Sequence, residues 1–291
     1  MTESSYTPSR IAVLSCIHGN IAALEVVWDD LRRQCVDRVV CLGDLVGYGP
    51  YPNEVIRFIQ RENIRTIRGC WDEGIGLENE DCGCKFMTEE DATHGHEAFV
   101  WTRKTVTDSH RKFLADLPFG YREVTSAAGS LLFVHGSPRN ASEYLMESTH
   151  DLILLERAAA AKTDVLLCGH THVPFSRQIE GVLRVRAEAS LKDRIQRDLG
   201  MIRTPAPREV LLAPKLIVNA GSVGEPRDGG TEATYVIFNT GTGATEIRRV
   251  AYDVEQVAKA ILKSGLPSQF AHRLLHGAEL APKNKESFCA C

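Results

Sequence analysis

The sequence predicts an α/β protein with mixed sheets, and two kinds of pattern lead to this prediction. Short apolar runs alternate with amphipathic helical patterns in the first third of the chain, which is typical of strand–helix–strand units around a largely parallel sheet. Later in the chain, strand-like runs flank glycine-containing turns, which indicates antiparallel hairpins. The composition is that of a globular protein, because 43% of the 291 residues are hydrophobic and 25% are charged.

The parallel part of the fold is predicted from the start of the chain. Residues 11–15 form the first strand, and Asn20 is expected to cap a helix whose apolar residues share one face. The second strand is predicted over residues 38–42, Pro52 begins the next helix, and residues 64–67 form the third strand. Further buried strands are predicted over residues 131–134, 164–168 and 215–218.

Two hairpins are predicted in the second half of the chain. Residues 175–185 are expected to turn at Glu180 and Gly181, and residues 235–250 are expected to turn at a Gly-Thr-Gly segment. The stretch 192–214 is charged and contains prolines, so we expect a surface excursion without chemistry there.

We expect one domain over residues 1–291. Within it, residues 88–118 are predicted to form two helices that cap a site, with a break near Thr107 and Asp108. Residues 252–280 are predicted to form C-terminal helices packed on the core, and residues 281–291 a polar tail.

Charge and cysteine content argue against several classes of protein. A formal net charge of -4 argues against a nucleic-acid partner, because phosphate binding needs a basic excess. The N-terminal segment is polar and the first apolar run is too short for a signal peptide or a membrane span, so we expect a cytoplasmic protein without a membrane partner. Nine cysteines without a secretion signal favour metal ligation, redox chemistry or burial over disulfides. A homo-oligomer is compatible with the sequence.

Side chains that bind metals follow five separate apolar runs, and each lies next to a glycine. Strand ends of an open α/β sheet converge on one crevice, which is where such folds bind ligands. The sequence therefore predicts a metal site at this crevice. Its seven candidate ligands are Cys16, His18, Asp44, Cys70, His135, His170 and His172.

The order of these motifs resembles the calcineurin-like metallophosphoesterases. The family pattern is D-x-H-G-N, G-D-x-x-x-x-G, G-N-H/W/C-D, H-G and G-H-T-H, and the chain has C-I-H-G-N, G-D-L-V-G-Y-G, G-C-W-D, H-G-S-P and G-H-T-H. The stretches GDLVGYGPYPNEVI and VNAGSVGEPRDG are similar to the bacterial branch that is grouped with diadenosine tetraphosphatase and protein phosphatase. The resemblance covers essentially the whole chain.

The resemblance implies a four-layer α/β/β/α sandwich with a small helical cap and a dinuclear metal centre. Asp44 would bridge the two ions, and the chain would hydrolyse a phosphomonoester or phosphodiester bond of a small phosphorylated substrate. One ion would be held by Cys16, His18, Asp44 and His172, and the other by Asp44, Cys70, His135 and His170.

Two positions depart from the family pattern, and both carry cysteine. Cys16 replaces the aspartate of the first motif and Cys70 the asparagine of the third. Thiolates favour zinc or iron over magnesium, with manganese also compatible, and the thiolate of Cys70 would repel a substrate phosphate. Three alternatives are therefore open: a decayed site, an iron or mixed-metal enzyme of redox or non-phosphate chemistry, and a thiol-based metal or redox sensor.

Four further residues are candidate catalytic or substrate-binding groups. Arg227 corresponds to a family arginine near the cleft and suits an anionic substrate, although a surface salt bridge is the alternative. Asp72 is expected to orient a metal-ligating histidine, or else to lie on the surface. Trp71 is expected to line the pocket or to pack as a core aromatic, and Asn20 to be a helix cap that also lies near the substrate.

The remaining cysteines form two further groups. Cys82 with Cys84, and Cys289 with Cys291, are paired C-x-C units that would bind zinc or an iron–sulfur cluster, or relay metal or electrons. The other three, Cys35, Cys41 and Cys168, are expected to be small buried hydrophobic residues.

Overall fold

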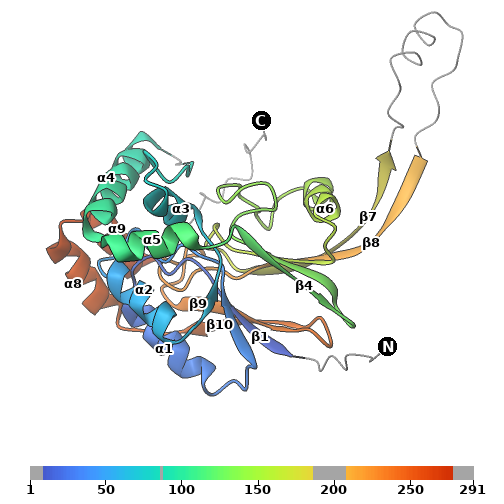
Figure 1. Cartoon of the computed structure of the whole chain (residues 1–291), viewed down its shortest axis with the longest axis horizontal. Coiled ribbons are helices and arrows are strands. Elements are labelled where there is room, and N and C mark those ends of the chain that lie inside the picture. The colour runs from blue at the N-terminus through green and yellow to red at the C-terminus, as the bar shows by residue number, and fades with distance from the viewer. Residues whose placement is uncertain (1–8, 86–87, 186–207, 278–291) are drawn as a thin grey trace, which may run out of the picture.

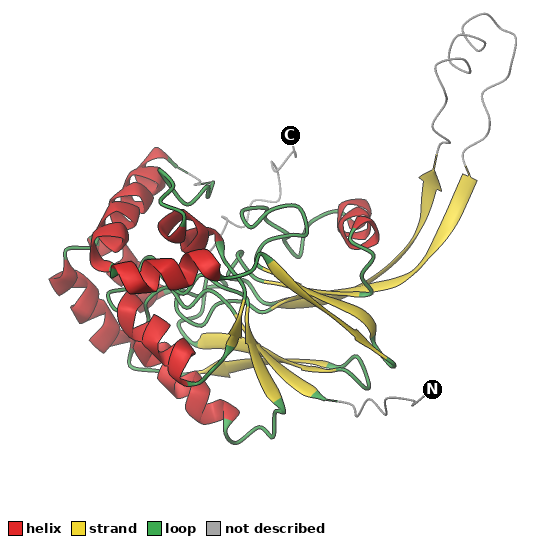
Figure 2. Cartoon of the chain, viewed as in Figure 1, coloured by secondary structure: helices red, strands yellow, loops and turns green. Residues whose placement is uncertain are grey.

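The computed structural model describes residues 9–85, 88–185 and 208–277. Two five-stranded sheets face each other, and helices lie on their outer sides (Figure 1; Figure 2). The α/β/β/α arrangement predicted for the chain is therefore confirmed. The limits of a single domain over the whole chain stay a prediction.

The first sheet has the strand order β10-β9-β1-β2-β3. β1 pairs in parallel with β2 and antiparallel with β9, and β9 and β10 form the predicted hairpin. The strands are β1 (Arg10–Leu14), β2 (Arg38–Cys41), β3 (Arg65–Thr66), β9 (Ala233–Asn239) and β10 (Thr245–Val250).

The second sheet has the order β4-β5-β6-β8-β7, with a parallel centre and an antiparallel strand at each edge. Its strands are β4 (Gly120–Thr125), β5 (Gly129–Val134), β6 (Val165–Cys168), β7 (Phe175–Val185) and β8 (Arg208–Asn219).

Two predictions about the edge of the second sheet are wrong. Residues 175–185 are not a hairpin but the single strand β7, which pairs with β8 along its length. The register shifts between Ile179 and Gly181, so the Glu180-Gly181 pair marks an irregularity in a continuous strand and not a turn. Residues 208–214 of the predicted excursion belong to β8, and residues 192–207 lie outside the described residues.

Three hydrophobic clusters hold the layers together. One lies between the sheets and includes Val13 of β1, Phe133 of β5 and Phe238 of β9, all fully buried. A second lies between the first sheet and its helices, and a third joins the second sheet to α6. Because the two sheets share a core, the ends of their strands are held in a fixed relation.

The helices mostly follow the sequence prediction. Asn20 caps α1 through its Oδ1, which accepts a hydrogen bond from the Ala23 N–H at 3.1 Å. The two predicted cap helices are present as α4 and α5. The helices are α1 (Ile21–Leu31), α2 (Pro52–Arg61), α3 (Cys70–Gly76), α4 (Glu89–Thr105), α5 (Asp108–Asp116), α6 (Asp151–Ala160), α8 (Val254–Ser264) and α9 (Ser268–His276).

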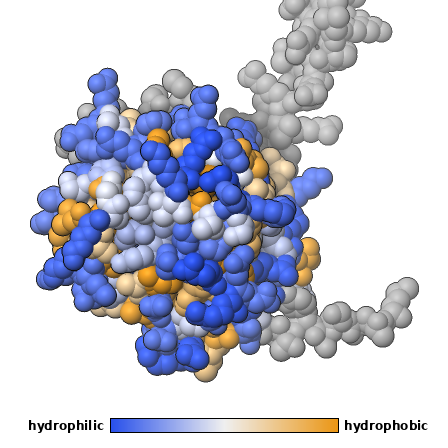
Figure 3. All heavy atoms as spheres, turned by 60° about the vertical axis from the view of Figure 1, so that its left-hand side comes forward, coloured by the Kyte–Doolittle hydropathy of each residue, from blue (hydrophilic) through white to orange (hydrophobic). Residues whose placement is uncertain are grey.

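The outer surface over the helices is mainly hydrophilic, with small hydrophobic areas between charged and polar side chains (Figure 3). Within the part of the chain that the structure describes, no helix has the length and apolar character needed to cross a membrane.

Candidate metal centre

The candidate ligands come from the carboxyl ends of strands in both sheets. Parallel strands of one sheet end at the same edge, and the shared core aligns the edges of the two sheets. Cys16 and His18 follow β1, Asp44 follows β2, Cys70 follows β3, His135 follows β5, and His170 and His172 follow β6. The structure thus brings all seven predicted ligands to one place.

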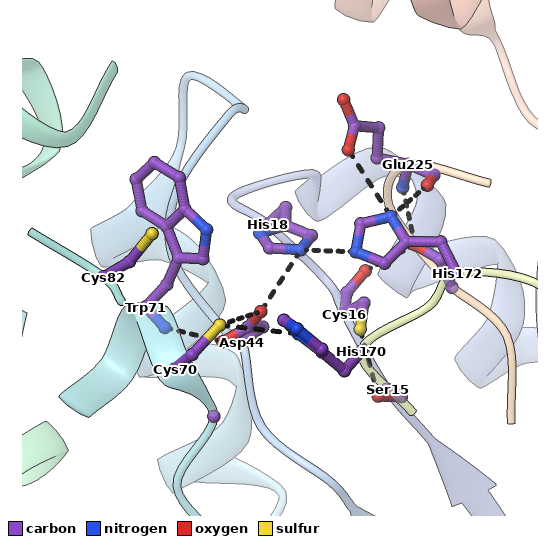
Figure 4. Close-up of polar contacts among 12 residues, drawn as sticks. Ser15, Cys16, His18, Asp44, Cys70, Trp71, Cys82, His170, His172 and Glu225 are labelled. Carbon is purple, nitrogen blue, oxygen red and sulfur yellow. Dashed lines mark hydrogen bonds and ion pairs between the residues drawn. The ribbon is translucent and has the colours of Figure 1, made fainter. Parts of the chain in front are cut away.

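The ligand atoms form two adjoining groups that meet at Asp44 (Figure 4). Asp44 Oδ2 lies 3.6 Å from His18 Nε2, 3.1 Å from His135 Nε2 and 3.5 Å from Cys70 Sγ. All seven side chains are at most 3% exposed. One group contains Asp44, Cys70, His135 and His170, and the other contains Cys16, His18 and His172, with all ligand atoms of a group within 4.8 Å of one another.

The backbone at these positions is strained. Non-glycine residues with positive φ cost about 1–3 kcal/mol each and concentrate at functional sites. Backbone hydrogen bonds hold the loop after β1 to the loop after β2, from Cys16 N to Gly43 O at 2.9 Å and from His18 N to Asp44 O at 2.9 Å. Five candidate ligands have φ between 48° and 65°: Cys16, His18, Asp44, His170 and His172.

Backbone carbonyl groups fix the tautomer of three histidines. His18 Nδ1 lies 2.9 Å from Val46 O, His135 Nδ1 lies 2.8 Å from Leu42 O, and His172 Nδ1 lies 2.5 Å from Glu225 O. A carbonyl oxygen can only accept, so each Nδ1 carries the proton and each Nε2 of a neutral ring presents a lone pair. This is the arrangement in which a second hydrogen bond orients a metal-ligating histidine.

The arrangement of His18 and His172 fits a bound cation. Their Nε2 atoms lie 3.0 Å apart, and both Nδ1 atoms are used by backbone carbonyls. Burial lowers the pKa of both rings, so both are neutral at pH 7 and two lone pairs face each other in the interior. A metal ion that both nitrogens can bind relieves this repulsion. The donor set therefore fits a metal.

The second group contains an ion pair around Asp44. Burial opposes the charge of His135, but the Asp44 carboxylate outweighs burial and raises the pKa of His135 to about 10. In turn, burial would raise the pKa of Asp44, yet the charge of His135 holds it below its usual range. Burial and the neighbouring His135 charge lower the pKa of His170 to about 3. His170 Nδ1 lies 3.5 Å from Cys70 Sγ, while its buried Nε2 has no hydrogen-bond partner among the described residues.

Both cysteines at the centre are protonated thiols without a metal. Burial raises the pKa of Cys16 to about 12 and that of Cys70 well above its usual value. A coordinated metal ion removes the thiol proton, so either side chain becomes a thiolate only on binding.

Asp72 positions the loop that carries Asp44. Its carboxylate accepts hydrogen bonds from Asp44 N at 2.7 Å, Leu45 N at 2.9 Å and Gly69 N at 3.0 Å. The side chain is fully buried, so its alternative placement on the surface is wrong. Asp72 therefore orients a candidate ligand through the backbone of Asp44, whereas the sequence prediction had it orient a histidine.

Arg227 is half-buried beside the centre, and its salt bridge is with the buried Glu225 and not at the open surface. Its Nη2 donates to Glu225 Oε2 at 2.6 Å, and its guanidinium lies 5.4 Å from the centre of the Tyr48 ring. The side chain is 12% exposed. Burial, and after it the charge of Arg227, lower the pKa of His172.

Asn20 and Trp71 are held by the protein itself. Asn20 Nδ2 donates to Gly224 O at 3.0 Å and to Tyr252 Oη at 3.2 Å, so the amide that caps α1 also binds the loop before Glu225. The Trp71 ring is buried and packs against the Tyr48 ring with centroids 4.6 Å apart. It is nearly perpendicular to the His18 ring, with centroids 6.2 Å apart. Contact of either residue with a substrate stays a prediction.

Sequence reasoning missed several residues of the site. Glu225 had a detectable signal because it lies two positions before Arg227, whereas no pattern in the sequence indicates a role for Tyr48. The Tyr144 ring lies 4.2 Å from that of His170, and its hydroxyl donates to Lys85 O at 3.4 Å. Tyr144 is brought there by folding of the loop after β5, and no local pattern indicates this.

The other cysteines differ in their surroundings. Cys84 Sγ lies 3.2 Å from Cys70 Sγ, so the Cys82–Cys84 pair adjoins the candidate centre. Cys41 and Cys168 are buried as predicted, but Cys35 is exposed, contrary to the prediction. The predicted pair Cys289 and Cys291 lies outside the described residues.

Comparisons with known proteins agree with this geometry. Residues 10–243 match the family model of the calcineurin-like phosphoesterase superfamily domain. An uncharacterised protein of Methanocaldococcus jannaschii is 32% identical over 272 residues, which cover 92% of this chain and 98% of that protein.

Two solved structures are also similar. A metallophosphoesterase from Sphaerobacter thermophilus has 27% identity and a TM-score of 0.66, over 94% of this chain and 100% of that chain. A hypothetical protein from Pyrococcus horikoshii OT3 has 21% identity and a TM-score of 0.70, over 93% and 99% of the two chains. The chain therefore belongs to the calcineurin-like phosphoesterase superfamily, a family of metal-dependent hydrolases that act on phosphoester bonds.

Proposed function

We propose that the chain hydrolyses a phosphomonoester or phosphodiester bond in a small phosphorylated molecule, at a dinuclear metal centre with cysteine ligands. The main support is the pair of facing Nε2 lone pairs of His18 and His172, together with the position of Asp44 Oδ2 between the two ligand groups. Cys16, His18, Asp44 and His172 would hold one ion, and Asp44, Cys70, His135 and His170 the other.

The cysteines select the kind of metal. Sulfur ligands favour zinc or iron, and they disfavour magnesium and calcium. Cys70 also adds a negative charge where the family pattern has a neutral asparagine, so this centre would attract a phosphate less strongly than its relatives. A compensating positive charge near the centre is therefore needed.

Arg227 supplies that charge. Glu225 accepts hydrogen bonds from its Nε at 3.1 Å and its Nη2 at 2.6 Å, which fixes the guanidinium and leaves Nη1 for a phosphate oxygen. Bound metal ions would lower the pKa of water and stabilise the charge that develops on the phosphate. Asp72 holds the loop of Asp44 in place, and the buried rings of Tyr48 and Trp71 keep water from one side of the centre.

The test is hydrolysis by protein purified without air and loaded with Zn²⁺, Fe²⁺ or Mn²⁺, using an aryl phosphate and a bis-aryl phosphate. We expect turnover with zinc or iron and its loss in His135→Ala, which removes a ligand. His276→Ala is the matched control, because His276 is exposed on α9. The double variant Cys16→Asp, Cys70→Asn is expected to prefer Mn²⁺.

Absence of turnover of both esters at full metal occupancy, measured by elemental analysis, would contradict the proposal. The iron redox alternative would instead show a thiolate-to-iron charge-transfer band without ester hydrolysis. A colourless zinc protein that hydrolyses either ester would rule that alternative out.

A further inference from the structure

A cluster of three thiols adjoins the candidate centre on the side of α3. Cys70 Sγ lies 3.2 Å from Cys84 Sγ, and Cys84 Sγ lies 3.8 Å from the backbone oxygen of Cys82. Figure 4 shows Cys82 on the same side of the centre as Trp71 and Cys70. Of these three cysteines, only Cys70 belongs to the proposed ligand set of the dinuclear centre.

The segment that carries Cys82 and Cys84 is folded back onto α3. Asn79 N donates to Gly74 O at 2.9 Å, and a Cβ on Gly74 would lie 2.7 Å from Asp81 O, so only glycine allows this approach. Gly83 has a φ of 67°, and its N–H donates to Asp81 Oδ1 at 2.7 Å. This left-handed turn separates the two cysteines, and Cys84 Sγ lies against Cys70 Sγ.

The three thiols differ in access to solvent. Cys70 is 2% exposed and Cys82 is 7% exposed, whereas Cys84 is half-buried. Cysteine sulfur is the ligand type that soft metal ions prefer, and an ion can reach this segment through the partly exposed Cys84.

The spacing of the sulfur atoms favours a metal over a disulfide. Zinc–sulfur bonds of about 2.3 Å in a tetrahedral site put two sulfur ligands about 3.8 Å apart, so Cys70 and Cys84 need to separate by about 0.6 Å. A disulfide of about 2.05 Å requires the same atoms to approach by more than about 1 Å. The metal-bound arrangement is the smaller change.

We propose that Cys70, Cys82 and Cys84 bind one additional soft metal ion of the Zn²⁺ class. The Cys70 thiolate is shared between this ion and the adjoining dinuclear centre, as thiolates of metal clusters are. The site lies outside the phosphoesterase ligand set and gives the chain a third metal position, with an entry from solvent at Cys84.

The test is an anaerobic titration of reduced, metal-free protein with Cd²⁺ as probe. Cys289→Ser and Cys291→Ser are included in every chain so that the C-terminal thiols supply no ligands. We expect three bound Cd²⁺ ions in this parent chain and two after Cys82→Ser, Cys84→Ser. The thiolate-to-cadmium absorption should fall to about half, because two of four thiolates remain. Cys35→Ser, an exposed thiol outside the cluster, is the matched control and should keep all three ions.

The inference is overturned if the parent and the Cys82→Ser, Cys84→Ser chains bind the same number of ions. It is also overturned if the reduced parent chain binds no third ion and mass spectrometry finds a Cys70–Cys84 disulfide after the same chain is oxidised. If the Cys82→Ser, Cys84→Ser chain fails to fold, the ¹¹³Cd NMR spectrum of the parent chain is the test. One of its resonances must have the chemical shift of cadmium with three sulfur ligands.

The outcome is independent of the proposed phosphoesterase activity. His135→Ala is expected to lose an ion of the dinuclear centre and to keep the ion that depends on Cys82 and Cys84. A parent chain with this ion but without ester hydrolysis would contradict the proposed function alone. A parent chain that hydrolyses esters with only two ions would contradict the third site alone.

Discussion

Arg227 and Glu225 form an ion pair beside the histidines, and in the proposed function this pair would set the charge that a substrate phosphate meets. Glu225 Oε1 also lies 3.6 Å from Arg273 Nη1, so the carboxylate is shared between two guanidinium groups. Removing Arg227 therefore leaves Glu225 with a positive partner. This makes Arg227 a residue whose role can be tested without exposing an unpaired buried carboxylate.

Arg227→Met is expected to lower kcat/KM for an aryl phosphate by about 10²-fold, because the phosphate loses a charged donor in a buried site. Metal content should be unchanged, as Arg227 is not in either ligand group. The control is Arg249→Met, which removes a half-exposed arginine paired with Asp228. Equal kcat/KM for Arg227→Met and the unmodified chain would show that the arginine does not contact substrate.

Single residues also show how far the sequence predicts the site. The seven candidate ligands were predictable because each follows a strand at its carboxyl end, where local sequence and topology coincide. Tyr144 and Cys84 were not recognised as neighbours of His170 and Cys70, because irregular loops bring them there. The bonds of Asp72 to backbone N–H groups were missed for the same reason, since they depend on the approach of two loops.

At the level of elements, α3 is held directly against the loop of Asp44. A Cβ on Gly69 would lie 2.2 Å from Asp44 Oδ1 and 2.3 Å from Asp44 N. The N–H of Trp71 on the first turn of α3 donates to Asp44 Oδ1 at 2.8 Å. The start of α3 and the shared carboxylate are therefore positioned together.

Gly69→Ala is expected to displace α3 from Asp44 and to lower metal affinity by at least about 10-fold, since the metal-orienting contacts of Asp44 are lost. Gly230→Ala is the matched control, because its Cβ would have only ordinary contacts at 3.4 Å and 3.6 Å. Calorimetric titration of both variants with Zn²⁺ measures the difference. Equal affinities would show that the close approach at Gly69 is not needed for binding.

Helices and strands with a strong local sequence pattern were predicted, and those with a weak pattern were not. The β9–β10 hairpin was predicted, whereas the Glu180-Gly181 pair indicated a turn in what is the continuous strand β7. A glycine in a strand marks either a turn or an irregular register, and only the pairing partner distinguishes them. β4 and α6 were not predicted, because β4 is half-buried at a sheet edge and α6 follows a long irregular segment.

At the level of the whole molecule, the two sheets contribute to one centre. Cys16, His18 and Asp44 follow strands of the first sheet, whereas the other three histidines follow strands of the second. An ion bound by both sets joins the two halves of the sandwich. A metal ion that binds the folded chain and not the unfolded chain then raises the free energy of unfolding.

We expect Zn²⁺ at 100 times its dissociation constant to stabilise the fold by about 2.7 kcal/mol, measured by urea unfolding at pH 7. The gain should shrink as the pH falls, because zinc must displace protons from the Cys16 thiol and from His135, whose pKa is about 10. His135→Ala should lose most of the gain, while His276→Ala keeps it. A gain that does not depend on pH would contradict this ligand set.

The metal-free chain should show the opposite trend with pH. The pKa of His135 is raised from 6.5 to about 10, so the folded state holds this proton more tightly than the unfolded state. The resulting stability is fully present below pH 6.5 and is lost as the pH rises through about 10. Unfolding of metal-free protein by urea between pH 6.5 and pH 10 measures this loss, and His135→Ala should not show it.

The backbone acceptors of His18, His135 and His172 have a consequence for how this protein can change over evolution. A peptide carbonyl is present whatever side chain occupies positions 42, 46 and 225, so no substitution there deletes the acceptor that sets the tautomer. Mutation at these three positions therefore leaves the tautomers of the three histidines unchanged. With the proposed ligand set, metal preference would then evolve through positions 16 and 70, where one-residue changes exchange oxygen, nitrogen or sulfur ligands within an unchanged frame.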